Sequence, residues 1–301
     1  MKTKKIINLF GGPGVGKSTT AQLIQIGSSL TFNLTFDLKF VIIKNEGGKM
    51  IKLNKQVVDF GQFPNGELYL DFTKLKTNSY NRIIWQYESN SDFLKLGLLK
   101  DYLDSIFSNT DLHILYLPYS RMDRVNDTYS FSLKYVTKLI NAMNFFAVKI
   151  REPHSDVTMA LIERSVREDW CITQVPKLIE ELVIKTIFFP DAGAQKRYAI
   201  DFPSAVGYKT RDFKTGSITD YTIQGEVGRS VLIIDDMCSR GGTFVHAVQE
   251  LWKKGAIIVY LLVSYCEENV HTGPALSYLE KIYTSNEMVK KDQDIITLGD
   301  K

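Results

Sequence analysis

Two adjacent carboxylates lie between a strongly apolar run and a loop of small residues in the C-terminal third of the chain. Asp235 and Asp236 directly follow Val231–Ile234, four β-forming residues that predict a strand buried on both faces. The loop after them consists of Ser239, Arg240, Gly241, Gly242 and Thr243. A helix is predicted over Thr243–Lys254, and its first backbone N–H groups and its dipole favour a bound anion. The pattern therefore predicts a phosphate site beside two carboxylates that can hold sugar hydroxyls.

The N-terminal segment carries a second pattern that is typical of phosphate binding. Residues 11–19, GGPGVGKST, satisfy G-x-x-x-x-G-K-[ST] after a strand-like run and before a predicted helix over Thr20–Ile26. The residues that define this extra phosphate loop are Gly11, Gly16, Lys17 and Ser18. An alternative interpretation makes Leu232–Asp236 the Walker B strand of this loop, but the glycine pair and threonine after the two acids have no purpose in a Walker B strand.

Too little chain separates the glycine loop from the unit that begins near Met50 to hold the sheet, switch elements and metal-binding acid of a P-loop kinase. Three interpretations remain: a fused or vestigial fragment of a neighbouring kinase-like gene, a start codon placed too early with Met50 as the working start, or a small extra phosphate site. We expect one of the first two, so that a chain beginning at Met50 keeps its activity.

Further segments, taken in order along the chain, resemble ribose-phosphate pyrophosphokinases. The segment around Asp235 and Asp236 resembles the ribose-phosphate motif of that family and of type I phosphoribosyltransferases. The other segments are FPNGE at 63–67, YSRMDR at 119–124, EPH at 152–154, FPDAGA at 189–194, YKTR at 208–211 and GPA at 273–275. The first five resemble, in this order, the family's F-x-D-G-E, Y-A-R-Q-D-R, D-L-H, S-P-D-x-G and K-x-R patterns. Together with GPA, the match runs from about Phe60 to Asn286.

The resemblance implies a role for each matching residue. It implies an ATP site, with the adenine part shared across a subunit interface, formed by Phe63, Glu67, Arg121, Met122, Asp123, Arg124 and His154. It implies that Asp235 and Asp236 contact the ribose hydroxyls and that residues 239–243 hold the 5-phosphate. Lys209 and Arg211 would be catalytic cations of a flexible loop, and His154 and Asp191 would lie at the Mg²⁺ site. The implied reaction is Mg²⁺-dependent transfer of pyrophosphate from ATP to the C1 hydroxyl of ribose 5-phosphate, giving PRPP and AMP.

The chain departs from the family pattern at three places. Asn65 replaces an acidic residue and Met122 replaces a glutamine, so details of the nucleotide site differ. Where the family commonly has D-T-A-G-T, residues 239–243 are SRGGT, which removes a carboxylate and adds the guanidinium of Arg240. A second phosphate attached to the first would gain from this bidentate cation. We therefore hypothesise that the acceptor is ADP-ribose, which presents the same free anomeric hydroxyl; divergent phage-type members look similar, and the activity would belong to NAD⁺ rebuilding.

Alternation of strand-like and helical stretches predicts an α/β protein with two phosphoribosyltransferase-type domains, each with a largely parallel sheet, after a short P-loop-like extension. The predicted divisions are 1–49, 50–163 and 164–301. Strands are predicted at 56–59, 68–72, 82–86, 112–116, 146–150, 186–189, 230–234 and 257–263, and helices at 93–108, 129–141, 157–167 and 243–254. Glu163, Arg164, Arg167 and Glu168 are predicted to form a solvated helix face.

Composition excludes several classes of protein. The 37 Lys and Arg against 34 Asp and Glu give a net charge of +3 over 301 residues, which does not argue for a nucleic-acid partner. With 44% hydrophobic and 24% charged residues, most of the chain is not disordered. Cys171, Cys238 and Cys266 form no C-x-x-C pair, which fits a reducing cytosol. No apolar run reaches the roughly 20 residues of a membrane span. We expect a soluble homo-oligomer in the cytoplasm, or in the host cytoplasm if phage-encoded, with no nucleic-acid or membrane partner.

Three other functions stay open at this point. A nucleobase phosphoribosyltransferase would consume PRPP and need no ATP site. A P-loop kinase or ATPase built around Lys17 would release ADP instead of AMP. A catalytically inactive regulatory homologue would bind the ligands without turnover.

Overall fold

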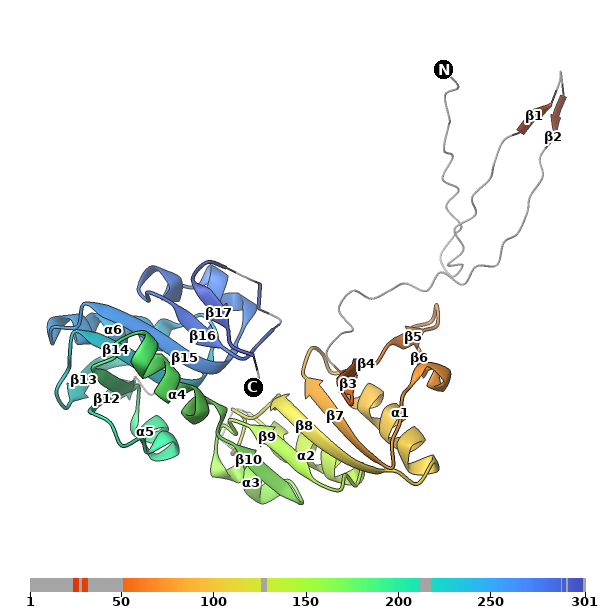
Figure 1. Cartoon of the computed structure of the whole chain (residues 1–301), viewed down its shortest axis with the longest axis horizontal. Helices are drawn as coiled ribbons and strands as arrows, with labels where there is room; N and C mark the ends of the chain where they lie inside the picture. Colours follow the sequence, from red (N-terminus) through yellow and green to blue (C-terminus); the bar gives the residue numbers. More distant parts are fainter. Residues whose placement is uncertain are drawn as a thin grey trace.

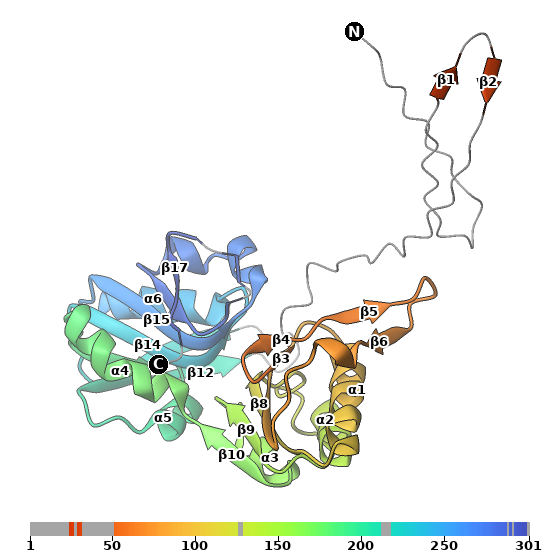
Figure 2. The ribbon, with the colours of Figure 1, turned by 45° about the vertical axis from the view of Figure 1, so that its right-hand side comes forward.

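Two β-sheets lie side by side in the computed structural model of the chain (Figures 1 and 2). The structure describes residues 24–26, 29–31, 51–125, 129–211, 218–287, 289–290 and 292–299. Each sheet has its own apolar core, so the chain from residue 51 onward is built as two halves. The predicted α/β class with largely parallel sheets is confirmed.

The first sheet has six strands in the order β10-β9-β8-β7-β3-β4. Strands β7 to β10 are parallel, whereas β3 runs antiparallel to both of its neighbours, β4 and β7. Its strands are β3 (Ile51–Leu53), β4 (Gln56–Val57), β7 (Tyr80–Gln86), β8 (Asn109–Tyr116), β9 (Val148–Arg151) and β10 (Ser165–Glu168), and its helices are α1 (Asp92–Ser105), α2 (Ser132–Ala142) and α3 (Asp156–Leu161). A hairpin, β5 (Phe60–Gln62) and β6 (Leu68–Leu70), followed by the short 3₁₀ helix η1 (Phe72–Lys74), projects from this half (Figure 2).

The second sheet has seven strands in the order β13-β12-β11-β14-β15-β16-β17. All neighbours are parallel except the hairpin of β12 and β13. The strands are β11 (Thr186–Phe189), β12 (Ser204–Arg211), β13 (Ile218–Gln224), β14 (Ser230–Cys238), β15 (Ile258–Cys266), β16 (Ile282–Thr284) and β17 (Ile295–Thr297). The helices are α4 (Trp170–Glu181), α5 (Ala192–Tyr198), α6 (Gly242–Lys253) and the 3₁₀ helices η2 (Glu268–Thr272) and η3 (Ala275–Ser277).

Strand β14 is the centre of the second half. Val231 and Ile233 point into the core on one face of the sheet, while Leu232 and Ile234 point into the core on the other. The strand is therefore buried on both faces, as its four consecutive β-forming residues predict. Its carboxyl end carries Asp235 and Asp236 to the edge where parallel sheets bind ligands.

The segment from Val157 to Glu168 differs from the prediction. A single helix was expected over Val157–Arg167, but α3 ends at Leu161 and Ser165–Glu168 form β10, which pairs with β9. The physical reason is that residues 165–168 form backbone hydrogen bonds with β9. This pairing outweighs the helical spacing of the apolar residues in the segment. The first sheet therefore continues past the expected division at residue 164, and the change of sheet falls between Glu168 and Trp170.

Local patterns also missed elements of the second half. Helix α4 contains Pro176 inside the helix, and α5 is a short helix capped by Asp191; neither was predicted from the sequence. Near the N-terminus, Ile24–Ile26 form β1, paired with β2 (Ser29–Thr31), instead of the end of the helix expected over Thr20–Ile26. The glycine-loop residues Gly11, Gly16, Lys17 and Ser18 lie outside the described residues.

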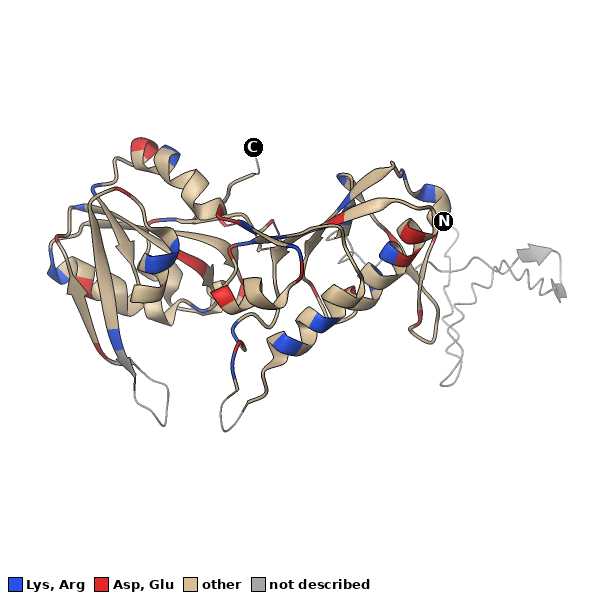
Figure 3. Cartoon of the chain, turned by 90° about the horizontal axis from the view of Figure 1, so that it is seen from below, with Lys and Arg blue, Asp and Glu red and all other residues tan. Residues whose placement is uncertain are grey.

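Charged residues of both signs are interspersed over the two halves (Figure 3). Within the described ranges, none of the helices combines the length and the apolar character that crossing a bilayer requires.

Candidate functional site

The loop after β14 is held tightly against the segment that follows η2. Gly241 has a φ of +80° in the left-handed region, and a Cβ added there would lie 2.3 Å from the Cβ of Ala275. A Cβ on Gly273 would lie 2.1 Å from the carbonyl oxygen of Arg240. Only glycine fits either position without displacing backbone, so the small residues of the two segments shape the loop. Beyond the loop, α6 begins at Gly242, so the first N–H groups of the helix directly follow the loop that was predicted to hold an anion.

The two aspartates at the end of β14 are partnered by side chains from both halves. His154 Nδ1, from the loop after β9, lies 2.6 Å from Asp236 Oδ2. Arg197 Nη1, from α5, lies 3.2 Å from Asp236 Oδ1 and 3.7 Å from Asp235 Oδ1. The structure therefore brings His154 to the aspartate pair, across the junction of the two sheets.

Burial and charge push the pKa values of the two aspartates in opposite directions. Burial, with the neighbouring charge of Asp236, raises the pKa of Asp235 well above its ordinary value. Burial acts in the same direction on Asp236, but the hydrogen bond with His154 and the charge of Arg197 outweigh it and lower the pKa of Asp236. Asp236 is thus held as a carboxylate that can accept hydrogen bonds from a sugar hydroxyl or bind a cation.

Arg197 is a site residue that the sequence reasoning missed. Its Nη2 donates to the carbonyl oxygen of His154 at 2.6 Å, while its Nη1 contacts both aspartates. The side chain is only 12% exposed, so the guanidinium is a largely buried link between the two halves. The signal that could have found it is an N-capping Asp191 followed six residues later by a cation, which places Arg197 in the last turn of a short helix.

Lys209 on β12 contacts the other acidic residue that was expected near the metal. Its Nζ lies 2.6 Å from Asp191 Oδ2, and Asp191 also accepts a hydrogen bond from the N–H of Ala194. Partial burial acts to raise the pKa of Asp191, but these two hydrogen bonds hold it below its ordinary value. Arg211 ends the same strand, and its side chain lies outside the described part of the structure.

The segment 119–124 lies between β8 and α2, next to the His154 loop. Asp123 is buried and accepts a hydrogen bond from Arg124 Nε at 2.9 Å. Burial works to raise the pKa of Asp123, but hydrogen bonds from Arg124 and Ser155 lower it on balance, and so does the charge of His154. Arg121 and Arg124 are exposed, and Met122 is half-buried, with its N–H on the carbonyl of Tyr119.

Phe63 and Glu67 stand apart from the other candidate residues. Both lie in the turn of the β5–β6 hairpin, where the N–H of Phe63 donates to the carbonyl oxygen of Glu67 at 2.8 Å, and the Phe63 ring packs against Tyr69. Phe63 is 46% exposed. Within the described residues, no hydrogen bond, ion pair or ring contact joins this turn to the rest of the candidate site, and the hairpin points away from the second half (Figure 1).

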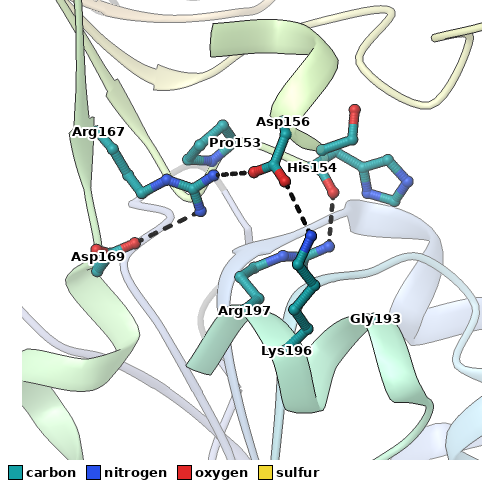
Figure 4. Close-up of a pocket in the computed structure, with 9 residues that line it drawn as sticks. Pro153, His154, Asp156, Arg167, Asp169, Gly193, Lys196 and Arg197 are labelled. Atoms are coloured by element: carbon teal, nitrogen blue, oxygen red, sulfur yellow. Dashed lines mark hydrogen bonds and ion pairs between the residues drawn. The ribbon is translucent and has the colours of Figure 1, made fainter. Parts of the chain in front are cut away.

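A cavity of about 510 Å³ lies between α5, β10 and the loop that carries His154 (Figure 4). Its rim is an ion chain in which Asp156 bonds Arg167 Nη2 at 2.8 Å and Lys196 Nζ at 3.3 Å. The lining residues are Pro153, His154, Ser155, Asp156, Arg167, Asp169, Gly193, Lys196 and Arg197. Three basic side chains from both halves line this space, and each is paired with a carboxylate of the chain.

Glu152 controls where the His154 loop leaves β9. Its φ is +43°, a strained conformation for a residue other than glycine, and its Oε1 accepts the N–H of Cys171 at 2.6 Å. Burial raises the pKa of Glu152 to about 7. This turn aims His154 at the second half.

The residues expected near a metal fit a site at which substrate phosphates would supply the remaining ligands. Among the described residues, no group of three or more His, Cys, Asp or Glu is placed to hold an ion by itself. Mg²⁺ is usually held by one or two carboxylates together with waters and substrate phosphates. Asp191, which is 37% exposed, and Asp236 are carboxylates of that kind, and each already faces a cation of the chain, Lys209 and Arg197 respectively.

No protein-family model matches the chain. Curated relatives named ribose-phosphate pyrophosphokinase do match over most of its length. The protein of Sulfurisphaera tokodaii is 26% identical over 267 residues, covering 84% of this chain and 91% of the relative. That of Saccharolobus solfataricus is 24% identical, covering 92% and 97%, and that of Methanosarcina acetivorans is 28% identical, covering 67% and 73%.

A solved structure shares the fold. The crystal structure of phosphoribosylpyrophosphate synthetase from Mycobacterium smegmatis superposes with a TM-score of 0.64 at 19% identity, covering 81% of this chain and 86% of that one. The match therefore spans both sheets.

Proposed function

Because this chain belongs to the ribose-phosphate pyrophosphokinase family of enzymes, we propose that it transfers the diphosphate of ATP to the C1 hydroxyl of a ribose 5-phosphate moiety, with AMP as the second product. The observation that carries the proposal is the meeting of His154 with Asp236 across the two sheets. This contact joins the half that carries the 119–124 segment to the half that carries residues 239–243, the anion loop. A transfer between two bound ligands needs such a junction, because the enzyme must hold both reactants in line.

Each candidate residue then has a defined task. Asp235 and Asp236 hold the ribose hydroxyls, and the loop at 239–243 holds the 5-phosphate at the start of α6. Arg121 holds ATP phosphates, while Lys209 and Arg211 neutralise the charge that develops on the transferred group. A bound Mg²⁺ would neutralise part of the charge on the phosphates. His154, Asp191 and Asp236 are the chain's own groups that would hold it.

The test is product analysis with ATP, Mg²⁺ and ribose 5-phosphate, and with no nucleobase added. The expected products are AMP and a ribose carrying diphosphate at C1, identified by mass spectrometry. Release of ADP would instead support a P-loop kinase, and turnover only with PRPP and a base would support a nucleobase phosphoribosyltransferase. Binding of ATP without any turnover would identify an inactive homologue.

The acceptor in this proposal is ADP-ribose as well as ribose 5-phosphate. Arg240 is exposed beside the anion loop, and its Nη2 donates to the carbonyl oxygen of Thr272 at 3.2 Å, which anchors a guanidinium next to the 5-phosphate position. A second phosphate in a diphosphate would gain a bidentate contact with this cation, whereas a terminal phosphate needs only the backbone of the loop. The product would serve NAD⁺ rebuilding.

Comparison of the two acceptors tests this finer proposal. Arg240→Ala is expected to raise the KM for ADP-ribose about tenfold and to change the KM for ribose 5-phosphate much less. Arg229→Ala, which removes an exposed arginine at the opposite end of β14, is the matched control. Equal effects of Arg240→Ala on both acceptors, or turnover of ribose 5-phosphate alone, would remove ADP-ribose from the proposal.

The exposed turn with Phe63 and Glu67 supports a homo-oligomer. Within one chain it contacts no other candidate residue, so it contributes to an ATP site only if it reaches the site of a second copy. Light scattering of the purified chain is expected to show a dimer or a larger assembly in solution. As part of the same proposal, the enzyme acts in the cytoplasm.

A further inference from the structure

Two tyrosines stack face to face between the halves of the molecule. The rings of Tyr116 and Tyr265 have centroids 3.8 Å apart and planes inclined by only 7°. Tyr116 is the last residue of β8 in the first sheet, and Tyr265 lies one residue before the end of β15 in the second sheet. Among the stacked or edge-on aromatic ring pairs of the described residues, this is the one that joins the two sheets.

The stack lies between the two segments that the proposed reaction must bring together. On the Tyr116 side, β8 leads directly into the 119–124 segment with Arg121. On the other side, Tyr265 is paired in register with Met237, the residue after Asp236. The charges of Arg121, Glu267 and Asp236 are close enough to Tyr116 to affect its pKa, which burial, the largest cause, raises to about 12. The stack therefore lies between the two parts of the proposed site, the 119–124 segment after β8 and the aspartate pair at the end of β14.

Its chemistry fits a spacer better than a ligand contact. Both rings are half-buried, and each covers one face of the other, so those two faces are closed to a nucleobase. Neither hydroxyl has a hydrogen-bond partner among the described residues, so the contact depends on the flat rings alone. A displacement of reacting groups by about 1 Å costs on the order of a hundredfold in rate. A rigid aromatic contact at this place is suited to setting that distance.

We propose that the Tyr116–Tyr265 stack is a positioning contact that fixes the distance between the 119–124 segment, which would hold ATP, and the anion loop at residues 239–243. This inference rests on the proposed function, so its test includes a measurement that needs no turnover. The two tyrosines touch no reacting group; they act through the strands that carry the two parts of the proposed site.

Kinetics of substitutions at Tyr265 are the first test. Tyr265→Leu keeps an apolar side chain but removes the flat ring, and it is expected to lower kcat about ten- to a hundredfold while the KM for ATP changes less than threefold. Tyr265→Phe keeps the ring and is expected to stay within twofold of the unsubstituted protein. Tyr116→Leu combined with Tyr265→Leu should be no worse than either alone, because both remove the same contact.

The matched control is Tyr260→Leu on the same strand. Tyr260 pairs with Tyr283, but both belong to the second sheet, so this ring pair joins nothing across the halves. It is expected to lower the melting temperature and leave kcat unchanged. An unchanged kcat in Tyr265→Leu, a loss in Tyr265→Phe equal to that in Tyr265→Leu, or additive losses in the double variant would each overturn the proposal.

A distance measurement separates this proposal from the proposed function. Spin labels are attached at Lys74→Cys in the first half and Lys253→Cys in the second, where the native side chains are 71% and 70% exposed. The native Cys171, Cys238 and Cys266 are buried, which favours selective labelling. With labelled chains diluted in an excess of unlabelled chains, Tyr265→Leu is expected to broaden the distance distribution and Tyr260→Leu is not. A distance distribution that Tyr265→Leu leaves unchanged overturns the positioning role of the stack even if the enzyme is active. A broadened distribution supports that role even if no AMP is released.

Discussion

Arg197 shows how one side chain can organise a site without matching any expected motif. The guanidinium reaches a carbonyl in the first half and two carboxylates in the second. Removing a partly buried ion pair is costly because the remaining charges lose their compensation. Asp235 and Asp236 would then be two acids at one buried place, and their proton affinities would rise together.

Substitution of Arg197 is therefore expected to affect stability first. Arg197→Met should lower the free energy of unfolding at pH 7 by about 3 kcal/mol, and Arg197→Lys should lose less because the charge is kept. Urea unfolding measures both. Lys196→Met, one residue earlier in α5 with a side chain that is 81% exposed, is the control and should cost less than about 1 kcal/mol. Equal losses in the methionine variants at 196 and 197 would contradict the role assigned to Arg197.

At the scale of elements, β10 has a polar network where a solvated helix face was predicted. Glu168 accepts hydrogen bonds from Lys149 Nζ at 2.5 Å and Arg151 Nε at 2.7 Å, and it contacts His113 Nε2 at 2.8 Å. Burial works to raise the pKa of Glu168, but the hydrogen bonds with His113, Arg151 and Lys149 lower it well below its ordinary value. The carboxylate therefore holds the edge strand to its neighbours.

Because the pKa of Glu168 is lower in the folded state, its stabilisation exists above the unfolded pKa, about 4.3, and disappears as the pH falls through the folded value. Glu168→Gln should thus lower the free energy of unfolding by about 3 kcal/mol at pH 7, and the difference from the unsubstituted protein should shrink steadily below about pH 4. Denaturation curves across this range measure it, with the exposed Glu163→Gln as the control. A difference that is independent of pH would exclude the carboxylate as its source.

The anion loop depends on its packing against the segment after η2. A methyl group at Gly273 has no room, because the carbonyl oxygen of Arg240 is backbone and cannot turn aside. Gly273→Ala is expected to displace the loop, destabilise the fold by about 1–3 kcal/mol and raise the KM for the sugar phosphate more than that for ATP. Calorimetry and steady-state kinetics measure the two effects. Gly97→Ala in α1, where the added methyl meets open space, should instead keep or improve stability. If Gly273→Ala raised the KM for ATP more than the KM for the sugar phosphate, this assignment of the loop would be contradicted.

For the whole molecule, both sheets and every described candidate residue lie after residue 50. The first sheet begins with β3 at Ile51, which pairs with β7. A chain that starts at Met50 is therefore expected to keep full turnover, and Lys17→Ala in the full chain should have no effect on kcat. AMP release measures both. A loss of turnover in either protein would show that the glycine loop takes part in the reaction.

The sequence by itself determined the fold class, the buried strand that ends in Asp235 and Asp236, and the loop and helix that follow, because all of these depend on neighbouring residues. Runs of β-forming residues and helical spacing are local signals, and the ordered segments were enough to point to the enzyme family. The same local signals failed for β10, α4 and α5, where pairing with a strand or docking on a sheet outweighs local preference.

Only the tertiary structure decided which side chains meet. His154 and Asp236 are 82 residues apart, Tyr116 and Tyr265 belong to different sheets, and Arg197 lies on a helix that the sequence did not predict. Such contacts are set by how the two sheets pack against each other. No spacing in the chain encodes that packing, because it depends on contacts between residues that are far apart in the sequence.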